Sequence, residues 1–432
     1  MKQILTLILL SFFSAKAQQN LQFTNPDALL NFAWQNSIAL KTGNVQVALA
    51  KYQTYYANIN RFNPRANVAY AATDNFQLPV NFIPTEIFGG PTGSFKEVKF
   101  GQQYIQNISI TPQIDLINPA AWAKLKSVKT SEQLSTLNVK LTQKTIAESV
   151  VAVYFNVVSL QEQVKILTKT LQNADSVLAI VQQKYSQGII RSQDVNTATV
   201  NQLLLQDRIQ QAQNGIEQQY VLLKSLCDIP ISSIVTIEHQ VKNSENIAIE
   251  NNTLKVQQAD LQVQYAQNEL KANQKSYYPT LSLIGNWAIQ ENSNQHFFDN
   301  NARWFPNSYL GLRLNFVIPD ANKLAQSSTV KSNVELANLN LKKQQFLQDT
   351  EQEQLRLEYQ KARESEAISK KIEYLKNDTY LKNLNLFQQD IYPTENLMNS
   401  FTDALNARLN HQVSSILVAF QQAKININNT IK

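Results

Sequence analysis

The sequence has 432 residues, a hydrophobic fraction of 43% and a formal net charge of +6. Because the charges are interspersed and form no basic stripe, nothing in the composition points to a nucleic-acid partner. The chain contains only 9 glycines and 12 prolines, confined to a few zones. That scarcity argues against several compact globular domains and favours long amphipathic helices.

Residues 1–17 have the pattern of a secretory signal peptide. Lys2 precedes an apolar run from Ile4 to Phe13, and Ala15-Lys16-Ala17 forms an A-x-A cleavage site. The run is too short to span a membrane as a helix. We therefore predict an exported chain that is cleaved after Ala17. No later segment offers about eighteen consecutive apolar residues, so any membrane crossing has to use strands.

Two stretches of the sequence predict very long helices. Neither glycine nor proline occurs from Ala120 to Gln187 or from Asp320 to Tyr392. At 1.5 Å per residue each stretch would extend roughly 100 Å as a helix, a length that argues for coiled-coil packing. Each is followed by a turn and a returning helix, and shorter helices are expected over 26–61 and 252–277. Two half-length helices stacked end to end would match one long helix beside them.

Four segments have the two-residue period of strands. They cover about 65–74, 102–117, 280–290 and 308–318. In the last of them Leu310, Leu312 and Leu314 alternate with polar or small residues. Strands of about ten residues with one apolar and one polar face are typical of a transmembrane β-barrel. Polar loops are expected at about 74–99 and 291–307.

The order helix–strand–strand–helix occurs twice, which predicts an internal repeat. The first copy covers 18–227 and the second 252–432, with a linker at 228–251 in an equatorial region. Pro119 corresponds to Pro319, and Gly188 corresponds to Asp390. Four strands cannot close a barrel, and lipid does not tolerate an open sheet edge. Three copies would supply twelve strands around a polar lumen and would assemble the long helices into a tube.

The turn between the first long helix and its returning helix carries the most specific residues. The pattern Y-x-x-G-x-x-[ST]-x-x-D-[VL] is present as Tyr185, Gly188, Ser192, Asp194 and Val195, with Ser192 one residue beyond its usual place relative to Asp194. A degenerate second copy is present in the second repeat: Phe387, Asp390, Thr394, Asn396 and Leu397. With these turns and this order of elements, the mature sequence resembles the TolC-type outer-membrane efflux proteins.

The resemblance implies a homotrimer in the outer membrane of a Gram-negative cell, with a 12-stranded barrel and a helical tunnel through the periplasm. It also implies a passive exit duct of a tripartite efflux or secretion system. A periplasmic adaptor would dock to the duct, and an inner-membrane transporter would supply the energy. No chemistry and no cofactor are implied.

The same resemblance assigns the two turns to the inner mouth of the tunnel. The candidate residues for the periplasmic aperture are Asp194, Asp390, Asn396 and Asn399. Those for contact with the adaptor are Gly188, Ile189, Ile190, Arg191, Ser192, Tyr392, Pro393 and Thr394. Relatives often narrow the mouth with aspartate rings, and the matching positions here are Asn396 and Asn399. An electrostatic gate would then depend on Asp390 or Asp194.

Ordinary helix-capping roles compete with these assignments. Gly188 can end one helix in a left-handed conformation, Ser192 can cap the next, and Asp194 then lies in its first turn. In the second repeat Pro393 is expected to stop the incoming helix, and Thr394 or Glu395 to start the outgoing one. Asn396 and Asn399 can equally be plain solvated positions.

Other side chains give little sign of chemistry. His239, His296 and His411 have no spacing that joins them to carboxylates or to Cys227 as a metal site, and no catalytic constellation is present, so an enzyme is not expected. Cys227, on an apolar seam, is expected to be inert. Aromatic residues in the second strand pair are candidates for a membrane-interface girdle: Trp287, Trp304, Tyr309 and Phe316. The alternative function is a structural or adhesive coiled-coil protein, which would explain the helices but not four amphipathic strands.

Overall fold

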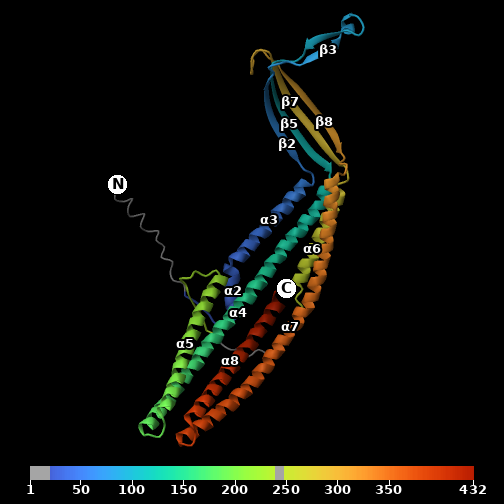
Figure 1. Ribbon diagram of the computed structural model, residues 1–432. Helices are drawn as coiled ribbons and strands as arrows, with labels where there is room; N and C mark the ends of the chain where they lie inside the picture. The colour runs from blue at the N-terminus through green and yellow to red at the C-terminus, as the bar shows by residue number, and fades with distance from the viewer. Residues whose placement is uncertain (1–19, 239–247) are drawn as a thin grey trace, which may run out of the picture. The chain divides into compact units, whose positions relative to one another are not determined.

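A computed structural model describes residues 20–238 and 248–432 (Figure 1). The predicted signal peptide lies outside the described residues. The chain forms two compact units. The first contains Lys342–Lys432 and the described parts of Met1–Gln46 and Ser135–Gln258, and the second contains Val47–Leu134 and Ala259–Leu341. Each unit contains parts of both predicted repeats, whose boundaries stay a prediction.

The described chain is mostly helical, as predicted. The helices are α2 (Pro26–Asn36), α3 (Ile38–Asn60), α4 (Pro119–Ser186), α5 (Ser192–Leu226), α6 (Leu254–Lys275), α7 (Ala321–Gln388) and α8 (Thr394–Thr430). Both α4 and α7 have 68 residues without interruption. Their length follows from the absence of glycine and proline, which would otherwise end a helix or remove its hydrogen bonds.

The prediction of one continuous helix over 26–61 is wrong, because the chain leaves the helical conformation at Ser37. This residue has φ −52° and ψ 121°, and it separates α2 from α3. A carboxylate from far along the chain caps the second helix: the Ile38 N–H donates to Asp228 Oδ2 at 2.7 Å. The Leu40 N–H also donates to the Ser37 hydroxyl at 3.4 Å. These contacts satisfy amide groups that a helix start leaves without partners.

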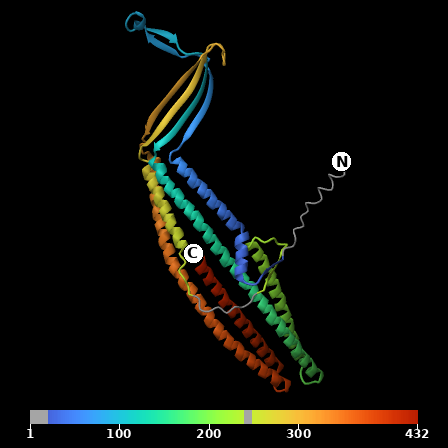
Figure 2. The same cartoon turned by 180° about the vertical axis from the view of Figure 1, so that it is seen from behind.

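A four-stranded antiparallel sheet forms part of the second unit. Its strands are β2 (Arg65–Asp74), β5 (Tyr104–Ile117), β7 (Thr280–Ser293) and β8 (Trp304–Asn315), in the order β2-β5-β7-β8 (Figure 2). The central pair β5–β7 joins the two predicted repeats. Compared with the segment predicted for it, β8 begins earlier, at Trp304, and ends earlier, at Asn315.

The register of the sheet gathers apolar residues on one face. Ile108 lies opposite Ile289 and Ile110 opposite Trp287. In antiparallel strands, directly opposed residues share a face. The other face carries residues such as Asn107, Ser109 and Asn286, so the predicted alternation is present in the strands. Ser282 and Asp115 also lie opposite each other on that polar face, and the Ser282 hydroxyl donates to Asp115 Oδ1 at 2.7 Å.

The polar loop predicted near 74–99 instead contains a β-hairpin. Strand β3 (Val80–Pro84) pairs with β4 (Phe95–Lys99), and a short 3₁₀ helix, η1 (Thr85–Phe88), leads into the turn. Gly89 and Gly93 have φ of +75° and +83°, which only glycine adopts without strain. A second feature without a signal in the sequence is a parallel pair of short strands, β1 (Asn20–Phe23) and β6 (Ile234–Ile237).

The interior of the first unit is formed by its helices. Within α4, Val150, Val151, Tyr154, Val157 and Val158 are each at most 1% exposed. By length and composition α4 also contains one window apolar enough to cross a membrane, and 44% of that window is buried inside the chain. We attribute the apolar character of α4 to this packing, since the core helix of a folded unit meets the same criterion.

Candidate functional site

The two turns that the sequence pairs, between α4 and α5 and between α7 and α8, lie at one end of the first unit (Figure 1). In the first turn Gly188 has φ +75°. The Gly188 N–H donates to the Tyr185 carbonyl at 2.9 Å, and the Ile189 N–H donates to the Lys184 carbonyl at 3.0 Å. This pattern satisfies carbonyls at the end of α4 and requires a left-handed residue, so glycine is suited to it.

The second turn has the same hydrogen bonds with a different residue. Asp390 has φ +63°. Its N–H donates to the Phe387 carbonyl at 3.1 Å, and the Ile391 N–H donates to the Leu386 carbonyl at 3.0 Å. Helix α7 therefore ends at Gln388, and the prediction that Pro393 stops it is wrong. The left-handed conformation at Asp390 ends the helix before the proline is reached.

The helices that leave the two turns begin in different ways. Arg191 is the N-cap of α5, and its N–H donates to Asp194 Oδ2 at 3.0 Å. Asp194 lies in the first turn as predicted, but Ser192 is the first helical residue and does not cap the helix. The carboxylate of Asp194 does this instead, where it also suits the helix dipole. Helix α8 begins at Thr394, one of the two predicted starts.

Lys184 connects the two turns, although no sequence pattern marks it as a candidate. Its side chain, from the last turn of α4, is only 9% exposed and forms an ion pair with the Asp390 carboxylate. The Lys184 ammonium also donates to the carbonyl oxygens of Phe387 at 2.9 Å and Gln388 at 3.4 Å. It lies 5.0 Å from the centre of the Phe387 ring. A cation at the carboxyl end of α7 complements the helix dipole and satisfies carbonyls that lack helical partners.

An apolar cluster supports the turns. Its buried members come from α4, α5, α7 and α8: Leu167, Ala174, Val177, Leu178, Val181, Ala198, Leu205, Tyr380, Phe387, Leu397, Met398, Phe401, Ala404 and Leu405. The rings of Tyr380 and Phe401 pack edge to face at 5.4 Å. The cluster therefore joins the two helical hairpins into one bundle near their turns.

The predicted tip residues differ in exposure. Exposed residues are Gly188, Ile189, Arg191, Ser192, Pro393, Asn396 and Asn399, whereas Ile190, Asp194 and Tyr392 are half-buried. Thr394 is buried, at 3% exposure. Asn396 and Asn399 lie on the solvent side of α8, and the neighbouring Leu397 and Met398 point into the apolar cluster. The structure thus brings Asp390 to Lys184 and Asp194 to Arg191, and leaves the two asparagines open to solvent.

A cluster of polar side chains joins α7 and α8 at a level farther along the helices than the turns. Glu373 accepts from Arg408 Nε at 3.2 Å and lies 2.5 Å from His411 Nδ1. Lys376 and Asp403 form an ion pair at 2.6 Å. Among the described residues no group of His, Cys, Asp and Glu could hold a metal ion. Cys227 is completely buried, and burial raises the pKa of its thiol to about 12.

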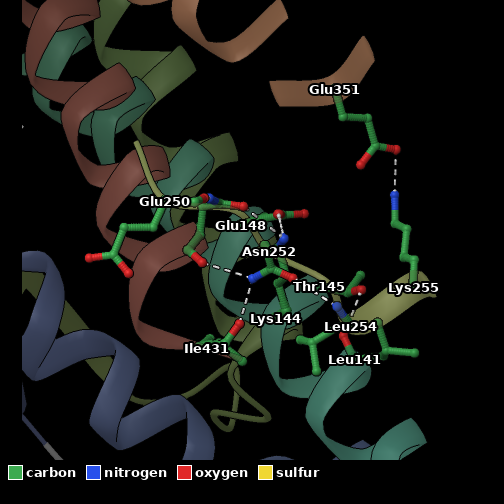
Figure 3. Close-up of polar contacts among 11 residues, drawn as sticks. Leu141, Lys144, Thr145, Glu148, Glu250, Asn252, Leu254, Lys255, Glu351 and Ile431 are labelled. Carbon is green, nitrogen blue, oxygen red and sulfur yellow. Dashed lines mark hydrogen bonds and ion pairs between the residues drawn. The ribbon is translucent and has the colours of Figure 1, made fainter. Parts of the chain in front are cut away.

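The end of α8 meets the start of α6 in the first unit (Figure 3). Asn252 donates to the carbonyls of Asn428 at 2.8 Å and Ile431 at 2.6 Å. A pocket of about 330 Å³ lies beside this junction. Lys144 lines it, 4.0 Å from Glu148, and burial lowers the pKa of the Lys144 ammonium.

The four candidate girdle residues do not lie at one level of the sheet. Trp304 begins β8, and Phe316 follows its last residue. Trp287 lies within β7 opposite Ser308, on the apolar face. Tyr309 lies opposite Asn286, on the polar face. All four are exposed, between 39% and 66%. The girdle stays a prediction.

The whole fold is similar to bacterial outer-membrane proteins of known structure. A membrane protein from Pseudomonas aeruginosa is 12% identical, with a TM-score of 0.76, over 94% of this chain and 90% of that one. The outer membrane protein VceC from Vibrio cholerae is 13% identical, with a TM-score of 0.73, over 93% of this chain and 95% of that one. The outer membrane channel CmeC from Campylobacter jejuni is 14% identical, with a TM-score of 0.69, over 96% of this chain and 89% of that one. No family model and no curated protein matches the sequence.

Proposed function

We propose that this protein is the outer-membrane exit duct of a tripartite efflux or secretion system, and that it works as a homotrimer. One observation carries the proposal: a four-stranded sheet with an apolar face and two edge strands stands in one chain with two long helical hairpins whose turns share a hydrogen-bond pattern. The similarity in fold to outer-membrane channels supports it.

The sheet supports the trimer. Among the described residues β2 and β8 are the edges of the sheet, and backbone groups at an edge have no partner in lipid. Val68 on β2 and Leu312 on β8 are 70% and 66% exposed on the apolar face. Three copies joined edge to edge would close twelve strands, with the apolar face toward lipid and the polar face toward a lumen.

The turns support a closable inner mouth. In a trimer, three copies of each turn would surround one axis, with Asp194, Asp390, Asn396 and Asn399 as aperture residues. We add Lys184 to this set, because it ties the first turn to the second. Its contacts with Asp390 and with the end of α7 favour one arrangement of the two hairpins. Opening the mouth by moving one hairpin would require these contacts to break.

The exposed tip residues are the proposed docking surface for a periplasmic adaptor, which would connect the duct to an inner-membrane transporter. They are Gly188, Ile189, Arg191, Ser192 and Pro393 at the surface, with Ile190 and Tyr392 half-buried behind them. Thr394 is too buried to contact a partner directly and would act through the start of α8. The protein would reside in the outer membrane and extend into the periplasm, with no cofactor.

Three measurements on the full-length exported protein test the proposal. Membranes are fractionated, and the detergent-extracted protein is weighed by native mass spectrometry and inserted into planar lipid bilayers. We expect outer-membrane location, a trimer and stepwise ionic currents. A stable, water-soluble monomer without detergent would contradict the proposal and would favour the structural coiled-coil alternative.

A further inference from the structure

The two edge strands have to meet between copies if the proposed trimer is right, and this inference rests on that proposed function. Strand β8 of one copy would lie beside β2 of the next. Their directions suit an antiparallel pair, since β8 runs away from the end of the sheet toward which β2 runs. The edges alone do not fix which residues would lie opposite each other.

The internal pairing between β5 and β7 supplies that register. The first repeat places Arg65 opposite Gln113, and the second places Thr280 opposite Asn315. These pairs align β2 with β7 and β5 with β8, the latter at an offset of 202 residues. The helix starts give the same offset, because α4 and α7 begin at residues 119 and 321, so the structure shifts the expected match of Pro119 with Pro319 by two residues. Within one chain, β5 is the last strand of the first pair and β7 is the first strand of the second pair. Between copies, β8 is the last strand of one chain and β2 is the first strand of the next. We therefore apply the register of β5 and β7 to β8 and β2.

The alignment of the two repeats identifies which residues of β8 and of the neighbouring β2 would lie opposite each other. Within the chain Ile110, three residues before Gln113, lies opposite Trp287, seven residues after Thr280. The counterparts of this pair are Leu312 of one copy and Ala72 of the next. Both positions lie on the apolar face of the sheet, so the register keeps apolar faces together.

The next pairs along the seam match exposed apolar side chains with one another. Leu314 would lie opposite Tyr70, and these side chains are 68% and 54% exposed in the single chain. Phe316 would lie opposite Val68, and these are 66% and 70% exposed. A slip of one residue would turn every one of these side chains against the polar face. Burial of such cross-strand pairs between copies would stabilise the seam.

The internal pairing also continues past the level where β2 ends. Tyr104 lies opposite Ser293 at the outer end of the β5–β7 pair. Their counterparts are Pro306 of one copy and Leu78 of the next, and Leu78 lies beyond the last residue of β2. The segment that follows β2 would therefore run beside the first residues of β8 in the neighbouring copy.

We propose that residues 75–80, the first part of the outer hairpin (residues 75–100), hold a second copy of this chain by lying against the first residues of its β8, with Phe76 opposite Ser308. The hairpin thereby extends the subunit seam beyond the sheet. Phe76 is 93% exposed in the single chain, and Trp304 in the facing strand is 39% exposed. Cover by the neighbour removes these surfaces from solvent.

The composition of the hairpin fits an identical, uncharged neighbour. Its ionisable residues balance, two acidic and two basic: Glu86, Lys96, Glu97 and Lys99. Several large apolar side chains are exposed on it: Phe76, Val80, Phe82, Ile87, Phe88, Phe95 and Phe100. Among the described residues β3 and β4 pair only with each other, and an isolated two-stranded hairpin is marginally stable in water. A neighbouring chain that covers its first residues, Phe76 and Val80 among them, supplies part of the missing burial.

Cysteine pairs test the register in membranes. The matched pair Tyr70→Cys with Leu314→Cys and the matched pair Phe76→Cys with Ser308→Cys are compared with pairs shifted by two residues, Tyr70→Cys with Leu312→Cys and Phe76→Cys with Leu310→Cys. The parent chain, whose Cys227 is buried, is the background control. We expect about tenfold more covalent trimer on non-reducing gels from the matched pairs, because Cα atoms more than about 7 Å apart cannot be bridged without backbone movement.

The outcomes separate this inference from the proposed function. The seam register is overturned if the protein is trimeric and conducting but a shifted pair cross-links as well as the matched one. The contact made by the hairpin is overturned if the seam pair cross-links and the Phe76–Ser308 pair does not, or if Phe76→Cys cross-links only to another protein. A protein that is monomeric and does not conduct contradicts the proposed function itself.

Discussion

The two hairpin turns of the first unit have the same backbone and different chemistry. Gly188 and Asp390 both adopt a left-handed conformation, and in each turn the same two amide groups satisfy carbonyls of the preceding helix. Glycine does this without strain, whereas a residue with a side chain does so at a cost in free energy. The second turn must therefore be held by something that the first turn does not need.

Lys184 supplies that support, and it comes from the first hairpin. Its ammonium pairs with the Asp390 carboxylate and donates to two carbonyls at the end of α7. The second turn therefore depends on the first, whereas the first turn satisfies its own backbone. Repeats can thus keep a common geometry while a contact between them makes their roles unequal.

The largest expected effect is that of Lys184→Met, which removes the ammonium and keeps most of the side-chain volume. The substitution leaves the Asp390 carboxylate and two carbonyls without their donor. We expect a loss of about 2 kcal/mol in the free energy of unfolding, since hydrogen bonds to a charged group contribute roughly 1.5–3 kcal/mol. Urea denaturation of the detergent-solubilised protein, followed by circular dichroism, measures it.

Lys165→Met is the matched control, because Lys165 also pairs with a carboxylate, Glu162, but its side chain is 70% exposed. Exposed pairs contribute at most about 1 kcal/mol. In bilayers Lys184→Met should also raise the current through the resting channel, and Lys165→Met should not. Equal stability of the two variants would show that Lys184 does not hold the second turn.

A smaller effect is expected at the first turn. Gly188→Ala adds a Cβ that meets no atom within 4 Å, so the change affects only the backbone, which has φ +75°. We expect a loss of roughly 1–2 kcal/mol in the free energy of unfolding, the usual cost of the left-handed conformation for an L-residue.

Asp390→Asn is the matched variant at the second turn, because asparagine tolerates this conformation and only the charge is lost. Its side chain is 53% exposed, so its cost should stay below about 1 kcal/mol.

The two variants are compared in the same denaturation experiment. If Gly188→Ala leaves the free energy of unfolding unchanged, the left-handed conformation costs an L-residue nothing at the first turn, and our account of the difference between the turns is wrong. The ranking is informative even if both values are small, because both substitutions preserve the length and packing of the helices.

The sequence predicts elements well where the signal is local. The absence of glycine and proline predicts α4 and α7, and the alternation of apolar residues predicts the four strands of the sheet. Prediction from the sequence fails where a contact joins residues that are far apart in the sequence. Asp228 starts α3 at a distance of 190 residues. Lys184 meets residues that lie about two hundred positions later. Helical periodicity gives no information about such partners.

Errors at the turns have a local cause as well. Ser192 is a preferred capping residue by type, but the Asp194 carboxylate, two positions later, accepts from Arg191 and shifts the start of the helix. The outer hairpin was missed because glycine and proline mark its turns, and those residues also mark irregular loops. Its exposed phenylalanines indicate a covered surface only when the neighbouring strands are known.

The smallest expected effect on stability is at the exposed face of the second hairpin. Asn396 and Asn399 stand three positions apart on α8 and point to solvent, so their replacement should change the free energy of unfolding by less than about 0.5 kcal/mol. Asn396→Asp with Asn399→Asp would nevertheless add six carboxylates to the proposed mouth of a trimer. We expect stronger cation preference and block by divalent cations on the tip side of a planar bilayer, since clustered carboxylates raise the local cation concentration.

Gln213→Glu with Asn214→Asp adds the same charge at exposed positions farther along α5 and serves as the control. If both double variants change the reversal potential equally, the added charge acts through the whole tunnel, and Asn396 and Asn399 are ordinary solvated residues.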